Sequence, residues 1–181
     1  MTFMKVNQKV PRVFILDVDG VMTTGHFLYT SEGKSLKIFG ADDNDGLSLL
    51  SSYIKIHFVT GDRKGFSISQ KRIVEDMKYP LDLVSTIRRI DWISARHDPA
   101  DVIYMGDGIF DHYVMSEVGY GIAPANADPN AKRYADFVTK RSGGDRAVAE
   151  ACLHILDKFF DPYDPGKLPH DQRNMSGEWT V

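Results

Sequence analysis

The stretch VFILDVDGVM, residues 13–22, decides the fold of this chain. Its apolar start contains β-branched residues and is typical of a strand buried on both faces of a parallel sheet. Asp17 ends this strand, and Asp19 and Gly20 follow. Ligands of open parallel sheets bind beyond the carboxyl ends of the strands, so we expect a functional site at Asp17. Because two carboxylates spaced by one residue repel each other, this site also has to hold a positive charge.

Short apolar runs alternate with segments of helical periodicity along the rest of the chain. This alternation is typical of βαβ units and predicts an α/β fold with a Rossmann-like, doubly wound parallel sheet. The further expected strands are residues 55–60, 81–84, 101–105, 120–123 and 136–138. The expected helices are residues 44–53, 66–77, 87–96, 111–118 and 145–160.

One segment just after the first strand breaks the alternation. Residues 27–39, FLYTSEGKSLKIF, carry two alternating runs on either side of Glu32 and Gly33, which predicts an inserted β-hairpin. Prolines and polar residues after residue 160 predict a tail rather than another element. We therefore expect a single domain over residues 1–160, with its hairpin at about 27–39, and a C-terminal tail over residues 161–181.

Composition and charge exclude several classes of partner. The chain has 181 residues, of which 43% are hydrophobic, and a formal net charge of -3. These values predict a globular domain, and the scattered basic residues argue against nucleic-acid binding. No apolar run reaches the roughly 20 residues of a membrane span and no cleavable leader is evident, so we expect a cytoplasmic protein without a membrane partner. The single cysteine, Cys152, excludes an internal disulfide, and its helical context predicts a buried position.

The ends of two other expected strands predict a metal site. The second ends in Thr60, and the fourth runs into GDGIFD, residues 106–111. Both should flank the first strand, so their ends meet at one edge of the sheet. One pocket would then gather the carboxylates of Asp17, Asp19, Asp107 and Asp111. Such crowding of like charges requires a hard cation, and Mg²⁺ is the natural candidate because it prefers oxygen ligands.

These groups permit the hydrolysis of a phosphate monoester. Asp17 can attack a phosphoryl group to give an aspartyl-phosphate, which water later cleaves. Asp19 can protonate the leaving oxygen as a general acid and then activate the water as a base. The Thr60 hydroxyl and the Gly61 N–H can bind the phosphoryl oxygens.

The motifs DVDGV, VTG and GDGIFD, in this order, resemble motifs I, II and IV of the haloacid dehalogenase superfamily of phosphohydrolases. The resemblance covers about residues 13–160. It implies that Asp17 is the nucleophile, Asp19 the acid/base and Thr60 the phosphate-binding hydroxyl. It also implies that Mg²⁺ is bound by Asp17, the Asp19 carbonyl and Asp107, with Asp111 holding the metal shell in place.

Motif III of this chain departs from the family pattern. The family usually has a lysine before the fourth strand, whereas residues 84–98, VSTIRRIDWISARHD, have none. Arg89 or its neighbour Arg88 is the best substitute by position, because a guanidinium can bridge a carboxylate and a phosphate. Lys64, which follows VTGD, is a second candidate.

The intervals between the motifs are too short for a cap domain. Projecting hairpin strands leave unpaired edges, which an oligomer would cover. The chain resembles one capless branch, the tetrameric phosphatases of 3-deoxy-manno-octulosonate 8-phosphate and related nine-carbon sugar acids. Besides the first motif and the hairpin, this resemblance rests on FGADDNDGLSLL, VMSEVGYGIAPANADP, ADFVT and SGGDRAVAEACLHIL. It implies a homotetramer that acts on a phosphorylated sugar acid.

Two aspartates stand where this branch commonly has arginines. They are Asp42 in FGADDNDG and Asp62 in TGD. The exchange removes two cations that could meet a sugar carboxylate. Asp62 and Lys64 would instead favour hydroxyl or amide groups, so a different phosphorylated sugar stays open as the substrate.

Two other functions fit part of the pattern. A signalling receiver shares the sheet, the acidic magnesium pocket and a phosphorylated aspartate, but it explains neither Asp19 nor the hairpin. A non-catalytic scaffold, for example one that serves a sugar-nucleotide synthetase, is supported only by the irregular motif III. Among local features, we expect Asp145 to cap the last helix, Trp92 to lie in the core, and Trp179 either to be disordered or to reach a neighbouring subunit.

Overall fold

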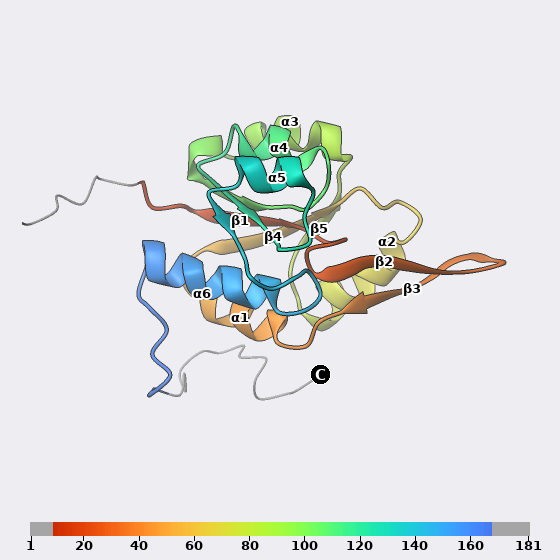
Figure 1. The fold of residues 1–181 in the computed structure, drawn as a ribbon, viewed down its shortest axis with the longest axis horizontal. Helices are drawn as coiled ribbons and strands as arrows, with labels where there is room; N and C mark the ends of the chain where they lie inside the picture. Colours follow the sequence, from red (N-terminus) through yellow and green to blue (C-terminus); the bar gives the residue numbers. More distant parts are fainter. Residues whose placement is uncertain (1–8, 168–181) are drawn as a thin grey trace, which may run out of the picture.

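The structure, a computed structural model, describes residues 9–167, which form a six-stranded parallel sheet with helices on both faces (Figure 1). The strand order is β5-β4-β1-β6-β7-β8, so β1 is central and β4 and β6 flank it. The strands are β1 (Val13–Asp17), β4 (Lys55–Thr60), β5 (Leu81–Leu83), β6 (Val102–Met105), β7 (Tyr120–Ala123) and β8 (Phe137–Val138). This topology confirms the predicted doubly wound α/β fold.

Two helical layers sandwich the sheet. The α-helices are α1 (Asp43–Leu50), α2 (Phe66–Gln70), α3 (Arg89–Ser94), α4 (Asp111–Met115), α5 (Pro129–Tyr134) and α6 (Ala147–Phe159). A π-helical stretch, η1 (Lys71–Asp76), continues α2, and two short 3-10 helices are η2 (Thr86–Arg88) and η3 (Pro99–Asp101). Figure 1 shows α1 and α6 on one face and α3, α4 and α5 on the other. Phe14 and Leu16 of β1 pack in the first layer, whereas Ile15 packs in the second. Every residue of β1 is buried because both of its faces are covered.

The predicted hairpin is a separate two-stranded sheet made of β2 (Thr23–Thr30) and β3 (Gly33–Phe39). It projects from the body beside α2 (Figure 1). It begins at Thr23, earlier than the predicted residue 27, because Thr23 pairs with Phe39 across the ribbon. A bulge interrupts the ladder where Leu28 pairs with Leu36 but Tyr29 pairs with Lys34, which leaves Ser35 as the extra residue of β3.

The structure corrects two further local expectations. Helix α5 was not predicted, although Pro129 stands at its first turn and the Asp128 side chain caps it. Asp145 does not cap the last helix: the capping position belongs to Arg146, which has a left-handed backbone with φ 68° and makes no side-chain cap. The Asp145 N–H donates to the Ser142 carbonyl, so Asp145 belongs to the turn that precedes the helix.

Other expectations concern single side chains and membrane spans. Cys152 is fully buried in α6, as predicted, and Trp92 is partly buried against the core. Trp179 and the predicted tail from residue 168 onward lie outside the described residues. Within residues 9–167, no helix has the length and apolar content needed to cross a bilayer, and no cap domain covers the sheet edge.

The packing of α1 against α6 depends on Gly46. A Cβ atom added to this glycine would lie 2.7 Å from the Ala149 Cα and 3.2 Å from the Ala149 Cβ. Backbone atoms cannot give way as a flexible side chain can, so the two helices approach closely only because Gly46 has no side chain.

We predict that Gly46→Ala destabilises the protein, by about 1–3 kcal/mol. In an exposed helix interior, replacing glycine by alanine would stabilise the protein by about 1 kcal/mol. A loss of stability would therefore show that residue 46 is in close contact with α6. Urea denaturation measures the free energy of unfolding. Asp157→Ala, on the exposed side of α6, is the control and should stay within about 0.5 kcal/mol of the wild type. A Gly46→Ala protein as stable as the wild type would contradict the packing argument.

Candidate active site

The predicted site lies at the carboxyl edge of the sheet, where β1, β4 and β6 end side by side. Carboxylate oxygens of Asp17, Asp107 and Asp111 lie within 4.8 Å of one another. Asp17 ends β1, Asp107 follows β6, and Asp111 begins α4. The structure thus brings together three of the four predicted carboxylates. The fourth, that of Asp19, is not in this acidic cluster and instead faces a lysine.

Gly20 leaves the space that the acidic cluster of Asp17, Asp107 and Asp111 needs. Gly20 has φ 84°, a left-handed conformation that lets the chain turn away after Asp19. A Cβ atom at Gly20 would lie 1.9 Å from the Asp107 Oδ2, so no larger residue fits while Asp107 keeps this position. The Asp17 Oδ1 accepts a 2.7 Å hydrogen bond from the Val18 N–H, which orients the other oxygen toward the cluster.

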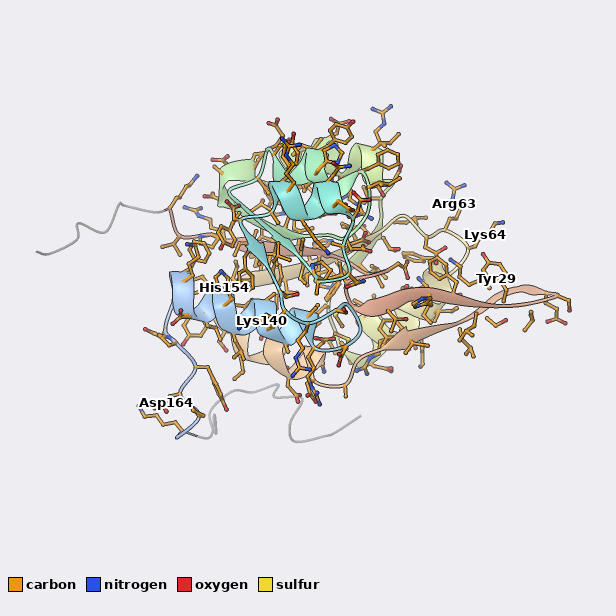
Figure 2. All side chains as sticks on the ribbon, viewed as in Figure 1. Tyr29, Arg63, Lys64, Lys140, His154 and Asp164 are labelled. Carbon is orange, nitrogen blue, oxygen red and sulfur yellow. The ribbon has the colours of Figure 1, made fainter. Side chains whose placement is uncertain are left out.

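Arg89 supplies the positive charge that the sequence required. Its side chain is 1% exposed, and its Nη1 donates to the Asp17 Oδ2 at 2.7 Å and to the Asp111 Oδ1 at 3.0 Å. The alternatives do not make this contact. Arg88 is exposed and pairs with Asp91 at 3.3 Å, and Lys64 is exposed at the outer edge of its loop (Figure 2). Of the three proposed substitutes for the family's lysine, only Arg89 lies against Asp17.

Tyr104 belongs to the same network, although the sequence analysis missed it. Its hydroxyl lies 2.6 Å from the Arg89 Nη1, which donates to it, and it donates to the Asp111 Oδ1, also at 2.6 Å. Burial raises the pKa of Tyr104 well above its usual value, so the hydroxyl remains a donor. A tyrosine in the middle of the buried strand VIYM was the available signal, because a buried hydroxyl needs a partner.

Burial and mutual repulsion make the acidic cluster hold protons. Burial raises the pKa of Asp17 to about 6, although the neighbouring Arg89 opposes this shift. Burial, and then the charges of Asp17 and Asp111, raise the pKa of Asp107 to about 8. Carboxylates that take up protons near neutral pH will exchange them for a cation, and an all-oxygen donor set suits a hard divalent ion. The residues present therefore fit a magnesium site.

The Asp19 carboxylate faces the hairpin. The Lys37 Nζ lies 2.8 Å from its Oδ1 and 2.9 Å from its Oδ2. Thr60, at the buried end of β4, directs its hydroxyl to the Asp19 Oδ2 over a longer 3.4 Å. The same hydroxyl accepts a 3.1 Å hydrogen bond from the Asp62 N–H. Asp19 and Thr60 are therefore adjacent, as the predicted phosphoryl transfer requires.

The predicted substrate residues differ in their surroundings. Gly61 is exposed beside Thr60 at the end of β4. Asp62 is held by two lysines, with the Nζ atoms of Lys34 at 2.6 Å and Lys37 at 2.9 Å from its Oδ2. Burial alone would raise the pKa of Asp62, but the hydrogen bonds from these lysines outweigh burial and lower the pKa to about 2. Asp62 is therefore a carboxylate at neutral pH, whereas Lys64 does not join this group.

Asp42, the other aspartate in place of an arginine, pairs with Arg146 at the start of α6. Both side chains are about half exposed, so the pair contributes little to stability. Each aspartate that replaces an arginine thus faces a cation of the same chain: Arg146 for Asp42, and Lys34 and Lys37 for Asp62.

Comparison with known proteins agrees with this geometry. Residues 66–151 match the family of haloacid dehalogenase-like hydrolases. The 3-deoxy-D-manno-octulosonate 8-phosphate phosphatase of Yersinia pestis is 34% identical over 155 residues, which cover 80% of this chain and 79% of the relative. The enzyme of the same name from Escherichia coli K12 has the same identity and coverage.

Solved structures of such phosphatases share the fold. The Moraxella catarrhalis enzyme, in complex with magnesium, phosphate and 3-deoxy-D-manno-octulosonate (KDO), has a TM-score of 0.69 and 26% identity, covering 81% of this chain and 86% of that one. The Yersinia pestis enzyme has a TM-score of 0.69 and 32% identity, covering 81% and 80%. The chain therefore belongs to the haloacid dehalogenase-like hydrolases, in the branch that contains the 3-deoxy-D-manno-octulosonate 8-phosphate phosphatases.

Proposed function

We propose that this protein is a magnesium-dependent phosphomonoesterase whose substrate is a phosphorylated sugar acid, such as 3-deoxy-D-manno-octulosonate 8-phosphate or a nine-carbon sugar-acid 9-phosphate. The observation that carries this proposal is the buried acidic cluster, with Arg89 in contact with Asp17 and Asp111. Relatives that are 34% identical are named phosphatases of 3-deoxy-D-manno-octulosonate 8-phosphate, and no comparison favours a receiver or a scaffold.

Asp17, Asp107 and the Asp19 carbonyl would hold the Mg²⁺, with Asp111 fixing the arrangement. Bound there, the ion supplies charge neutralisation that lets an anionic phosphate approach anionic carboxylates. Arg89 stays positive whatever the pH, because an arginine does not deprotonate in proteins. It can therefore screen Asp17 from Asp111 throughout the reaction.

The side chains provide a two-step transfer in which Asp17 is the nucleophile. A carboxylate oxygen of Asp17 bonds to phosphorus while the bond from phosphorus to the sugar oxygen breaks, and Asp19 donates a proton to that leaving oxygen. In the second step Asp19 takes a proton from water, whose oxygen bonds to phosphorus as the aspartyl bond breaks. Inorganic phosphate leaves, and Asp17 and Asp19 return to their initial states. We propose that the Thr60 hydroxyl and the Gly61 N–H bind the phosphoryl oxygens.

The identity of the sugar acid depends on the pairs formed by Asp42 and Asp62. These aspartates remove positive charge from places where the branch commonly has arginines, and Asp62 is itself neutralised by two lysines. We propose that Gly61, Asp62 and Lys64 contact the substrate, with Asp62 and the exposed Lys64 binding its hydroxyl or amide groups.

We also propose a cytoplasmic homotetramer, with residues 1–160 as its hydrolase domain and 161–181 as a tail. The hairpin supports this assembly, because Leu36 and Ile38 of β3 are 59% and 48% exposed and Phe27, Leu28 and Tyr29 of β2 are also exposed. Figure 2 shows Tyr29 on the projecting ribbon. Apolar side chains gathered on one ribbon are typical of a surface that another subunit covers.

Asp17→Asn is expected to abolish turnover, because an amide cannot form the phosphoryl ester. With Mg²⁺ and 3-deoxy-D-manno-octulosonate 8-phosphate, we expect phosphate release to fall by at least about a thousandfold. A phosphate assay measures the rate. The matched control is Asp164→Asn, an exposed aspartate far from the sheet edge (Figure 2). If the wild type released no phosphate from this ester or from any other phosphorylated sugar, the proposed function would be wrong.

Arg89→Met is expected to lower the free energy of unfolding of the metal-free protein by about 3–5 kcal/mol, because it leaves buried carboxylates without their cation. Arg89→Lys keeps the charge and should recover part of both the stability and the turnover. Arg88→Met, its exposed neighbour, should stay within about 0.5 kcal/mol of the wild type. Equal stability of the two methionine variants in urea denaturation would refute the role given to Arg89.

Mg²⁺ is expected to stabilise the protein more at high pH than at low pH. The pKa of Asp107 is raised from 3.8 to about 8 by folding, so the metal-free folded protein binds a proton that the unfolded chain releases, and its stability falls as pH rises through this window. Within this window, at pH values below about 8, the proton on Asp107 competes with the ion. Thermal unfolding with and without Mg²⁺ at about pH 6 and about pH 8.5 measures the difference.

Asp107→Asn tests the assignment of this pH dependence. The variant should lose most of the Mg²⁺-induced increase in Tm, and its metal-free stability should fall less as pH rises. An increase in Tm that is equal at both pH values in the wild type would rule out proton release from Asp107 as its origin.

A further inference from the structure

We propose that Lys37, on the hairpin, is a positioning residue that fixes the Asp19 carboxylate, so that the hairpin completes the active site of its own subunit. The inference rests on the proposed function, because it assigns Lys37 a task only if Asp19 is the acid and base of a phosphoryl transfer. It differs from the assembly role of the hairpin, which rests on exposed apolar side chains such as Leu36 and Ile38, the neighbours of Lys37 on β3.

The Lys37 ammonium group is enclosed by groups of its own chain. Its side chain is 0% exposed, and its Nζ donates to the Asp19 Oδ2 at 2.9 Å and to the Ser69 Oγ at 2.8 Å. It also lies 2.8 Å from the Asp19 Oδ1 and 2.9 Å from the Asp62 Oδ2, as an ion pair with each carboxylate. Lys37 is therefore a fixed internal cation that acts through Asp19 and makes no direct contact with the substrate.

Two stretches distant in sequence build this arrangement. Lys37 comes from β3, whereas Asp62, in the loop after β4, and Ser69, in α2, belong to one later stretch of the chain. Gly65 leaves the space they need, because a Cβ atom there would lie 2.2 Å from the Asp62 Oδ2 and 2.9 Å from the Lys37 Cε. The Gly65 N–H also donates to the Asp62 Oδ1 at 3.0 Å. The loop after β4 therefore packs closely against the Lys37 side chain through Asp62 and Gly65.

Strand β3 buries a charged side chain and exposes apolar ones, which is the reverse of an ordinary amphipathic strand. Leu36 and Ile38 face outward, whereas Lys37 between them is buried. Strict alternation would put Lys34 on the face opposite to Lys37, but the bulge at Ser35 turns both lysines toward Asp62. Burying a lysine costs desolvation energy that an ion pair does not always recover. An apolar residue at this position would stabilise the hairpin without that cost. Holding the Asp19 carboxylate in place explains why the position has a lysine instead.

A misplaced Asp19 should slow proton transfer to the leaving group. Displacement of a catalytic group by about 1 Å can cost on the order of a hundredfold in rate. The effect depends on the leaving group, because an alkoxide needs the proton and a nitrophenolate leaves without it. Loss of Lys37 should therefore affect an alkyl phosphate more than an aryl phosphate, a difference that a merely structural role would not produce.

The experiment compares Lys37→Met with the wild type in single-turnover release of the leaving group, which reports the first step alone. With 3-deoxy-D-manno-octulosonate 8-phosphate we expect this rate to fall by about 10–100-fold, with KM changed less than about twofold. With p-nitrophenyl phosphate the loss should be at least about fivefold smaller. Lys34→Met is the matched control, because Lys34 pairs with Asp62 but has no recorded contact with Asp19. An equal loss on both substrates, or a rise in KM, would overturn the proposal.

A double-mutant cycle with Asp19→Asn tests whether Lys37 acts through Asp19. Lys37→Met should reduce the rate of the Asp19→Asn protein by less than about twofold, because the group that it positions is already gone. The same loss in both backgrounds would overturn the proposal. If Lys37→Met does not fold, Lys37→Gln, which keeps a donor without the charge, takes its place in every arm.

A crystal structure of Lys37→Met gives a readout that needs no turnover. We expect the Asp19 carboxylate to leave its position or to occupy several orientations, and an unchanged single orientation would overturn the proposal. A wild type inactive on every phosphate ester would refute the proposed function instead, and the crystal structure would still decide whether Lys37 orients Asp19.

Discussion

Repulsion among carboxylates at one edge of the sheet is the constraint on which the rest of this structure depends. Asp17 ends β1, Asp107 follows the neighbouring β6 and Asp111 begins α4, so the parallel topology brings their carboxylates together. Arg89 is buried between Asp17 and Asp111, and Tyr104 joins the hydrogen-bond network. Burial, and then the charges of Asp17 and Asp111 that Arg89 does not fully offset, raise the pKa of Asp107. The site is thus built to exchange protons for a divalent ion.

Two separate networks, each of carboxylates paired with cations, lie at the sheet edge. In the first, Arg89 lies with the carboxylates of the acidic cluster. In the second, Lys37 and Lys34 lie with Asp19 and Asp62. The division separates Asp17, the proposed nucleophile, from Asp19, the proposed acid and base, although only one residue lies between them in sequence. Asp17 faces Arg89 and Asp19 faces Lys37, so each carboxylate is oriented by its own cation.

Much of the fold and of the acidic site could be predicted because both depend on local patterns. A buried apolar strand that ends in Asp17, and polar residues after the two neighbouring strands, fix the topology and the place of the site. The same logic placed Asp19 among the other carboxylates, and this was wrong. Repulsion from three buried acids and attraction by Lys37 turn its side chain the other way, and both effects depend on tertiary contacts.

Other features could not be predicted because tertiary packing overrides the local signal. The alternation in KSLKIF favours Leu36 and Ile38 as the buried face, but the structure buries Lys37, since carboxylates lie beneath the ribbon. Asp145 has the side chain of a helix cap, yet the turn before α6 places Arg146 at that position. The choice among Arg88, Arg89 and Lys64 needed the position of α3 against β1, which no short motif contains.

The extra residue at Ser35 makes the hairpin sensitive to odd and even changes in length. Successive side chains of a strand alternate between its faces, so inserting one residue between Lys37 and Phe39 would carry the lysine to the solvent side and turn Leu36 inward. Inserting two would restore both. The tip of this hairpin can therefore vary in length. Near its base, only insertions or deletions of an even number of residues keep Lys37 buried and the apolar side chains exposed.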